Sequence, residues 1–161
     1  MNSTITTTTS EREIIITRLL DAPRELVFEA WTNPKHIVNW FGPDGFTTTI
    51  KEWNLEPGGV WRFTMHGPDG RDYPNKIVFI EIVKPERLVY KHNDDGTEGL
   101  QFHVTVTFEM RGNQTFLTMR TLFDTKEELD YVVKEHGAIE GGHQHANRLA
   151  QYLLKMEELS S

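Results

Sequence analysis

The pattern of apolar and polar residues divides the chain into a short helical part, a long strand-rich part and a helical end. Residues 11–20 are β-branched and apolar and predict a strand that stops at Asp21-Ala22-Pro23. Apolar residues then recur at helical spacing in two short segments, separated by Asn33-Pro34. We expect Asp21 to cap the first helix and Asn33 the second, because such side chains accept hydrogen bonds from free amide groups.

Between residues 46 and 123 apolar positions alternate with polar ones, which is typical of strands with one buried face. Six such runs are separated by turns rich in Gly, Pro, Asn and Asp, one of them a loop expected at 93–96. Short turns between consecutive strands favour an antiparallel meander. The predicted strands cover residues 46–55, 60–66, 75–83, 87–92, 100–110 and 115–123. With the strand at 11–20, the sheet is expected to have seven strands.

The C-terminal region is expected to be helical. Thr125 and Glu128 have the spacing of a capping box, which predicts the start of a short helix. From residue 139 to residue 156, apolar and small residues recur every three or four positions and predict one long helix. Because this is the only long amphipathic element, we expect it to cover the buried face of the sheet. The sequence therefore predicts one α+β domain over residues 11–161, preceded by a disordered arm over residues 1–10.

The long helix has little side-chain volume at its N-terminal end, where Gly141 and Gly142 lie. A twisted sheet that curves around one helix leaves a hollow, which large side chains must fill. Trp61, Phe63 and Tyr90 are expected to face this end of the helix. Either these rings pack against the helix and close the hollow, or a cavity of roughly 300–1,000 Å³ remains. The pattern alone leaves both alternatives open.

Composition and charge exclude several functions. The net charge of −7, from 17 basic and 24 acidic residues, repels polyphosphate, so we expect no nucleic-acid partner. No apolar stretch approaches the roughly 20 residues of a membrane-spanning helix, and no membrane insertion is expected. The chain has no cysteine, which agrees with a cytoplasmic location, and its N-terminus lacks the pattern of a secretory signal.

The residues offer little for catalysis or metal binding. All four serines lie within the first ten or last two residues, so neither a serine nor a cysteine nucleophile is expected. His143 and His145 point away from each other on a helix, and the Glu140–His143 spacing needs a partner helix. We therefore expect no metal and no cofactor. General acid–base work by Tyr90, His92, His143 or Glu81 remains open, although Glu81 is expected to point to solvent.

Five segments of the chain carry a resemblance to a known family. They are DAPRELVFEAWTNPKHIVNWFGP, EPGGVWRFTMHGPDG, PERLVY, VTVTFEMRGNQTFLTMR and GAIEGGHQHANRLAQYL, and the match runs from about residue 12 to residue 156. The sequence resembles the activator-of-heat-shock-protein-90-ATPase-like family of the START/Bet v 1-like (SRPBCC) superfamily. The resemblance implies a helix-grip fold: a seven-stranded antiparallel sheet wrapped around a long C-terminal helix, with two short helices after the first strand.

Three hypotheses of function follow, since this superfamily includes carriers, cyclases and co-chaperones. The first is a module that binds a small hydrophobic or aromatic molecule, with His143 and Asn147 orienting it. The second is a cyclase- or hydrolase-type enzyme that uses the same cavity. The third is a protein-interaction domain that contacts a chaperone ATPase or forms a homodimer. The residues predicted to bind the ligand are Trp40, Phe41, Trp61, Phe63, Met65, Tyr90, Phe102, Val104, His143 and Asn147.

Overall fold

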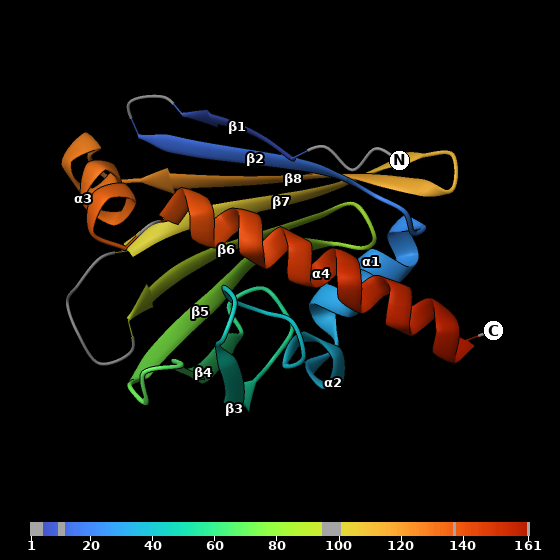
Figure 1. The fold of residues 1–161 in the computed structure, drawn as a ribbon, viewed down its shortest axis with the longest axis horizontal. Coiled ribbons are helices and arrows are strands. Elements are labelled where there is room, and N and C mark those ends of the chain that lie inside the picture. Colours follow the sequence, from blue (N-terminus) through green and yellow to red (C-terminus); the bar gives the residue numbers. More distant parts are fainter. Residues whose placement is uncertain (1–4, 10–11, 95–100, 137, 161) are drawn as a thin grey trace.

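The computed structural model describes the backbone of residues 5–9, 12–94, 101–136 and 138–160, and the side chains of most of them. Its strands form an antiparallel sheet in the order β1-β2-β8-β7-β6-β5-β4-β3 (Figure 1). The strands are β1 (Ile5–Thr9), β2 (Glu13–Leu20), β3 (Thr47–Trp53), β4 (Val60–His66), β5 (Asp72–Val83), β6 (Arg87–Asp94), β7 (Gln101–Arg111) and β8 (Gln114–Phe123). The helices are α1 (Arg24–Thr32), α2 (Pro34–Ile37), α3 (Lys126–His136) and α4 (Ala138–Ser160).

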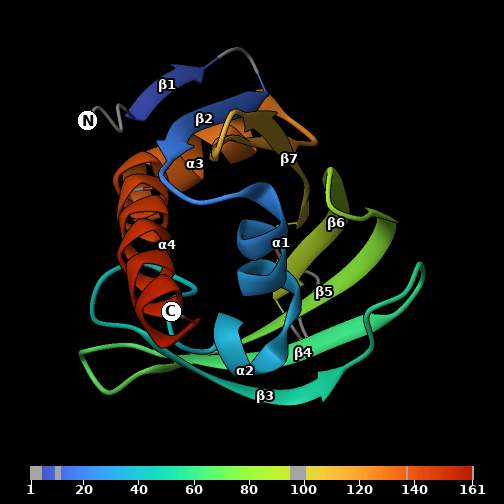
Figure 2. The same cartoon turned by 90° about the vertical axis from the view of Figure 1, so that its right-hand side faces the viewer.

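The sheet curves around its helices, as Figure 2 shows, with α4 and α1 inside the bend. Helix α4 turns one apolar stripe towards the sheet, on which Ala146, Leu149 and Leu153 are buried. The small helices α1 and α2 cover the other part of the hollow, where Trp31 and Trp40 pack edge to face. The helix-grip prediction is thereby confirmed, because a long C-terminal helix lies against the concave face of an antiparallel sheet.

The N-terminal residues differ from the prediction of a disordered arm over residues 1–10. Ile5–Thr9 forms strand β1, which pairs antiparallel with β2 from Ile5 opposite Arg18 to Thr9 opposite Ile14. Consecutive threonines favour extended backbone, and β2 would otherwise be an open edge that accepts another strand. The sheet thus contains the seven predicted strands and one more. Of the loop expected at 93–96, the first two residues belong to β6 and the rest lies outside the described residues.

The helix starts agree with the sequence at two of three places. Asn33 caps α2, since its side chain accepts a hydrogen bond of 2.9 Å from the amide of Lys35. Thr125 caps α3 in the same way, at 3.1 Å from the amide of Glu128. The expectation that Asp21 caps α1 is wrong, because the helix begins one residue after Pro23 and has no side-chain cap.

Candidate functional site

A cavity of about 310 Å³ lies between the N-terminal part of α4, the loop after α2 and the inner faces of β2, β4 and β6–β8. Its volume is at the lower end of the range for small-ligand sites, roughly 300–1,000 Å³. None of the described residues around it is Asp, Glu, Lys or Arg. The lining consists of Ile14, Ile16, Trp31, Phe41, Gly42, Pro43, Met65, Tyr90, His92, Phe102, Val104, Met119, Thr121, Phe123, Val132, Gly141, Gly142 and His145.

Two glycines of α4 explain where the cavity lies. A Cβ atom on Gly142 would overlap the side chain of Ile16 in β2, so the helix backbone approaches the sheet closely there. A Cβ atom on Gly141 would meet only Pro43, at 4.0 Å, which leaves space beside the helix. Further along α4, Ala146 and Leu149 are fully buried and fill the interface. The hollow is therefore open at the glycine end of α4 and packed at the other.

The cavity brings together half of the residues predicted to bind a ligand. Phe41, Met65, Tyr90, Phe102 and Val104 all line it. The last three come from β6 and β7, where strand alternation turns every second side chain to the inner face. Together with Met65 of β4 and Phe41 of the loop after α2, they provide apolar walls to the cavity.

Three predicted aromatic residues belong to the packed core instead. Trp61 and Phe63 stack on each other with ring centroids 4.0 Å apart, and the Phe41 ring lies against both of them. Phe41 thus separates this pair from the cavity. Trp40 is fully buried, and its indole nitrogen donates a hydrogen bond of 3.0 Å to the carbonyl of Ala30.

The two polar residues chosen from α4 also lie away from the cavity. Neither His143 nor Asn147 is part of its lining. The Asn147 amide oxygen accepts a hydrogen bond from the Arg18 guanidinium of β2. These two side chains lie on parts of α4 that face β2 or solvent, because the helix is rotated so that position 145 points inward.

His145 is the polar residue that α4 does direct into the cavity. Its Nδ1 accepts a hydrogen bond of 3.0 Å from the backbone amide of Gly42. The rings of Trp31, Trp40 and Phe41 surround it, with centroids 4.7–5.6 Å away. Burial, together with the nearby charge of Arg148, lowers the pKa of His145 to about 3. The imidazole is therefore neutral at physiological pH.

His92 of β6 is a second neutral imidazole in the cavity wall. Its Nε2 is 2.9 Å from the side-chain oxygen of Asn75, and the amide nitrogen of Asn75 donates to the carbonyl of Tyr73 at 2.9 Å. The ring lies 4.9 Å from that of Phe102. Burial lowers the pKa of His92 to about 4. Part of each histidine ring faces the cavity, and both are shielded from charge-stabilising solvent.

Tyr90 and Thr121 add two hydroxyl groups to the wall. Burial raises the pKa of Tyr90, an effect that the nearby indole of Trp31 opposes weakly. The Trp31 N–H does not, however, reach hydrogen-bonding geometry with any described group. The Tyr90 hydroxyl therefore stays protonated at physiological pH, and it accepts no hydrogen bond from the Trp31 indole.

The loop after α2 is tied to α4 by three side chains. One Arg148 nitrogen points at three successive backbone carbonyls, the nearest being that of Pro43 at 2.7 Å. The Gln144 side chain accepts a hydrogen bond of 3.0 Å from the amide of Asp44. Together with the bond from Gly42 to His145, these contacts hold one wall of the cavity against the helix.

His145 was missed by sequence reasoning, and His92 was considered only for acid–base work. The signal for His145 was nevertheless present, because position 145 comes three residues after Gly142 and four before Leu149 in the buried stripe. The pattern did not reveal which edge of that stripe borders the hollow. For His92, alternation with Tyr90 places it on the inner face.

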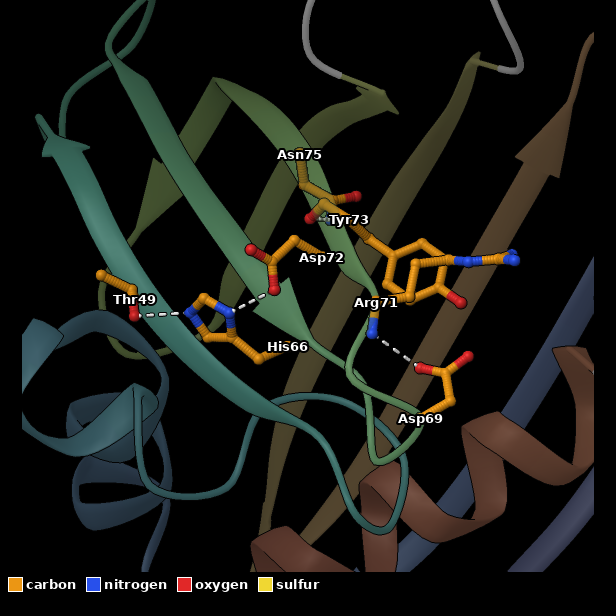
Figure 3. A network of polar contacts seen from close by, with 7 residues as sticks. All are labelled: Thr49, His66, Asp69, Arg71, Asp72, Tyr73 and Asn75. Carbon is orange, nitrogen blue, oxygen red and sulfur yellow. Dashed lines mark hydrogen bonds and ion pairs between the residues drawn. The ribbon is translucent and has the colours of Figure 1, made fainter.

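A different polar network lies on the outer face of the sheet (Figure 3). His66 is 2.8 Å from the Thr49 hydroxyl through Nε2 and 2.8 Å from the Asp72 carboxylate through Nδ1. This order of groups is that of a hydroxyl–imidazole–carboxylate triad. However, the Asp72 side chain is 64% exposed and that of His66 38% exposed, and both lie on the face opposite the cavity. The contacts connect β3, β4 and β5 at the surface.

Neither a metal site nor a membrane span is found within the described part of the chain. No group of three His, Asp or Glu side chains there is arranged to hold a metal ion. None of the described helices is long and apolar enough to cross a membrane.

The curved sheet and the helix that it grips define a helix-grip domain, with the cavity between them. Residues 21–154 match the family described as activator of Hsp90 ATPase homolog 1-like protein, and the chain belongs to this family. The family and the fold support a ligand-binding or co-chaperone-like domain. A comparison with curated proteins found no match.

Several solved structures share the fold at low sequence identity. A protein from Arthrobacter aurescens, solved by NMR, is 23% identical, with a TM-score of 0.86 over 93% of this chain and 91% of that one. A protein from Rhodobacter sphaeroides is 24% identical, with a TM-score of 0.83 over 95% and 99% of the two chains. A protein from Nitrosomonas europaea is 23% identical, with a TM-score of 0.81 over 94% and 99%. At such identities the likeness concerns the fold alone.

Proposed function

We propose that this protein binds a small hydrophobic or aromatic molecule in the cavity beside the N-terminal part of α4. The observation that carries the proposal is a cavity of about 310 Å³ whose described lining is largely apolar and contains no charged residue. Burying about 200 Å² of ligand apolar surface contributes on the order of 5 kcal/mol before association costs, so micromolar affinity is expected.

The ligand-contacting residues proposed are the five predicted ones that line the cavity, together with His92 and His145. Phe41, Met65, Tyr90, Phe102 and Val104 supply apolar contact area. An enzymatic role would call for a cavity histidine or tyrosine paired with a carboxylate, and no carboxylate is among the described lining residues. Binding without chemistry is thus the better supported use of this site.

The proposal is tested with the neutral fluorescent reporter N-phenyl-1-naphthylamine and a variant that fills the cavity. In Gly141→Leu, the new side chain has room to grow beside Pro43, since an added Cβ would lie 4.0 Å from that residue. Leu also favours helix over Gly, so the variant is expected to fold. We expect the wild type to bind the reporter at micromolar concentration and the variant to bind at least about tenfold more weakly.

The matched control is Glu140→Leu, which places the same side chain on the exposed neighbouring position of α4. This variant should bind the reporter like the wild type. Native mass spectrometry of the protein purified from its own host complements the titration by detecting a retained small molecule. Equal reporter binding by Gly141→Leu and wild type would contradict the proposal.

A further inference from the structure

The hydrogen bonds around the two cavity histidines determine which ring nitrogen carries the proton in each. A backbone amide can only donate, so Nδ1 of His145, which accepts from Gly42 at 3.0 Å, carries no proton. The neutral ring therefore holds its proton on Nε2. No described residue forms a hydrogen bond with that Nε2, which leaves an N–H donor at the cavity wall.

The same reasoning gives the opposite result for His92. A carbonyl can only accept, so the Asn75 atom 2.9 Å from the carbonyl of Tyr73 is its amide nitrogen. The Asn75 oxygen therefore faces His92 Nε2 at 2.9 Å and accepts a proton from it. The neutral ring of His92 then has a lone pair on Nδ1, and none of the described groups donates to it.

Besides the Tyr90 and Thr121 hydroxyls, the cavity thus presents one imidazole N–H and one imidazole lone pair on otherwise apolar walls. A charge on His92 would disfavour protonation of His145, and burial keeps both rings neutral. No Asp, Glu, Lys or Arg is among the described lining residues, so an ionic ligand contacts no counter-charge in this part of the wall. An unpaired charge is costly to bury, whereas a neutral polar group needs only its hydrogen bonds.

We propose that the cavity selects an uncharged ligand whose polar end carries both a hydrogen-bond acceptor and a hydrogen-bond donor, as a carboxamide or lactam does. The ligand acceptor takes the proton of His145 Nε2, and the ligand donor gives to the lone pair of His92 Nδ1. This inference rests on the proposed function, since it names the ligand class for the same cavity. A carboxylate is disfavoured, because its charge would be unpaired and it has no donor for His92.

Four naphthalenes that differ only in the polar end test this selectivity. They are 2-naphthamide, which has an acceptor and a donor; 2-acetylnaphthalene, which has the acceptor alone; 2-methylnaphthalene, which has neither; and the 2-naphthoate anion. Each is titrated at neutral pH by displacement of N-phenyl-1-naphthylamine. We expect the amide to bind about tenfold more tightly than the ketone or the anion, with methylnaphthalene the weakest neutral compound.

Two variants assign the two hydrogen bonds. In His145→Asn the shorter side chain places its oxygen near the former Nδ1, so it keeps an acceptor for Gly42 but lacks the Nε2 proton. This variant should weaken the amide and the ketone alike, by about fivefold to tenfold, and leave methylnaphthalene unchanged. In His92→Phe the lone pair is lost, so the amide should lose its advantage over the ketone.

His103→Phe is the matched control, because His103 lies on β7 between the inward-facing Phe102 and Val104 and so on the outer face of the sheet. It should leave all four affinities unchanged. If the reporter binds but the four naphthalenes bind equally, or the anion binds best, the selectivity is wrong and the proposed function stands. If neither the reporter nor any naphthalene binds the wild type, both the selectivity and the proposed function fail.

Discussion

On the outer face of the sheet, His66 makes contacts through both ring nitrogens, whereas on the inner face His92 and His145 are each bonded through one. The partners of His66 are the Thr49 hydroxyl and the Asp72 carboxylate, and solvent reaches all three. The inner histidines have backbone or amide partners and no carboxylate beside them. Both ring nitrogens of the outer histidine have protein partners, while each inner histidine has one ring nitrogen without a hydrogen-bond partner among the described residues.

The difference teaches that a resemblance to a catalytic triad is a weaker indication of a site than a polar group in a cavity wall that has no protein partner. Exposed groups exchange their protein partners for water at little cost, so their hydrogen bonds contribute little to stability or recognition. A buried donor or acceptor without a partner costs free energy, which a ligand recovers when it supplies the partner. The comparison therefore supports the proposal that ligand binding takes place on the inner face.

The largest expected effect is the loss of stability in acid caused by the inner histidines. Their folded pKa values of about 4 and about 3 are below the ordinary value of 6.5, so the unfolded chain takes up protons first. Stability is therefore fully present above about pH 6.5 and declines as the pH falls towards the folded values. Between pH 7 and about pH 5 we expect the two histidines together to lower the free energy of unfolding by about 3 kcal/mol, and the loss continues below that pH.

The measurement is urea denaturation at pH 7 and at about pH 5. It compares the wild type with the double variant His92→Gln, His145→Asn. Carboxylates titrate in both proteins and cancel in the comparison. The double variant should lose about 3 kcal/mol less than the wild type between the two conditions. An identical decline in both proteins would show that the inner histidines are not held neutral by the fold.

A smaller effect is expected from removing one hydrogen-bond partner on either face. Asn75→Ala leaves the Nε2 proton of His92 without its acceptor inside the protein, which should cost about 2 kcal/mol of unfolding free energy. Asp72→Ala removes the carboxylate that faces His66 at the surface, and should cost no more than about 0.5 kcal/mol. Thermal or urea denaturation of both variants measures the difference. Equal losses would remove the distinction between the two faces.

The smallest expected effect concerns chemistry at the outer network. The Asp72 carboxylate and the Thr49 hydroxyl are both exposed to solvent, so we expect no acyl transfer. Hydrolysis of p-nitrophenyl acetate by the wild type should match that by His66→Gln, and Thr49→Val should change stability by less than about 0.5 kcal/mol. A rate that depends on both His66 and Thr49 would reverse the comparison.

Strand alternation and helix periodicity were sufficient to predict most of the fold. The period of two between residues 46 and 123 correctly placed Tyr90, Phe102 and Val104 on the inner face. The stripe from residue 139 to residue 156 correctly identified the gripped helix. These predictions succeeded because each depends on local geometry, in which the side-chain direction follows directly from the position in the element.

Local geometry did not suffice to predict strand β1 or the register shift in β5. Residues 5–9 show no alternation of apolar and polar side chains, and they become a strand only because β2 offers a free edge. In β5 the register shifts between Phe79 and Glu81, so the alternation that buries Ile77 and Phe79 and leaves Ile80 45% exposed does not continue regularly to the end of the strand. Both features arise from pairing with another strand.

What the sequence determined by itself is the set of side chains that face the concave side of the sheet and the helix that covers them. Only the tertiary structure decided which of those side chains border empty space. The ring of Phe41, from a distant loop, covers Trp61 and Phe63 and assigns them to the core. The proton positions on His92 and His145 likewise depend on partners far away in sequence, because a hydrogen bond between distant residues exists only once the chain has folded.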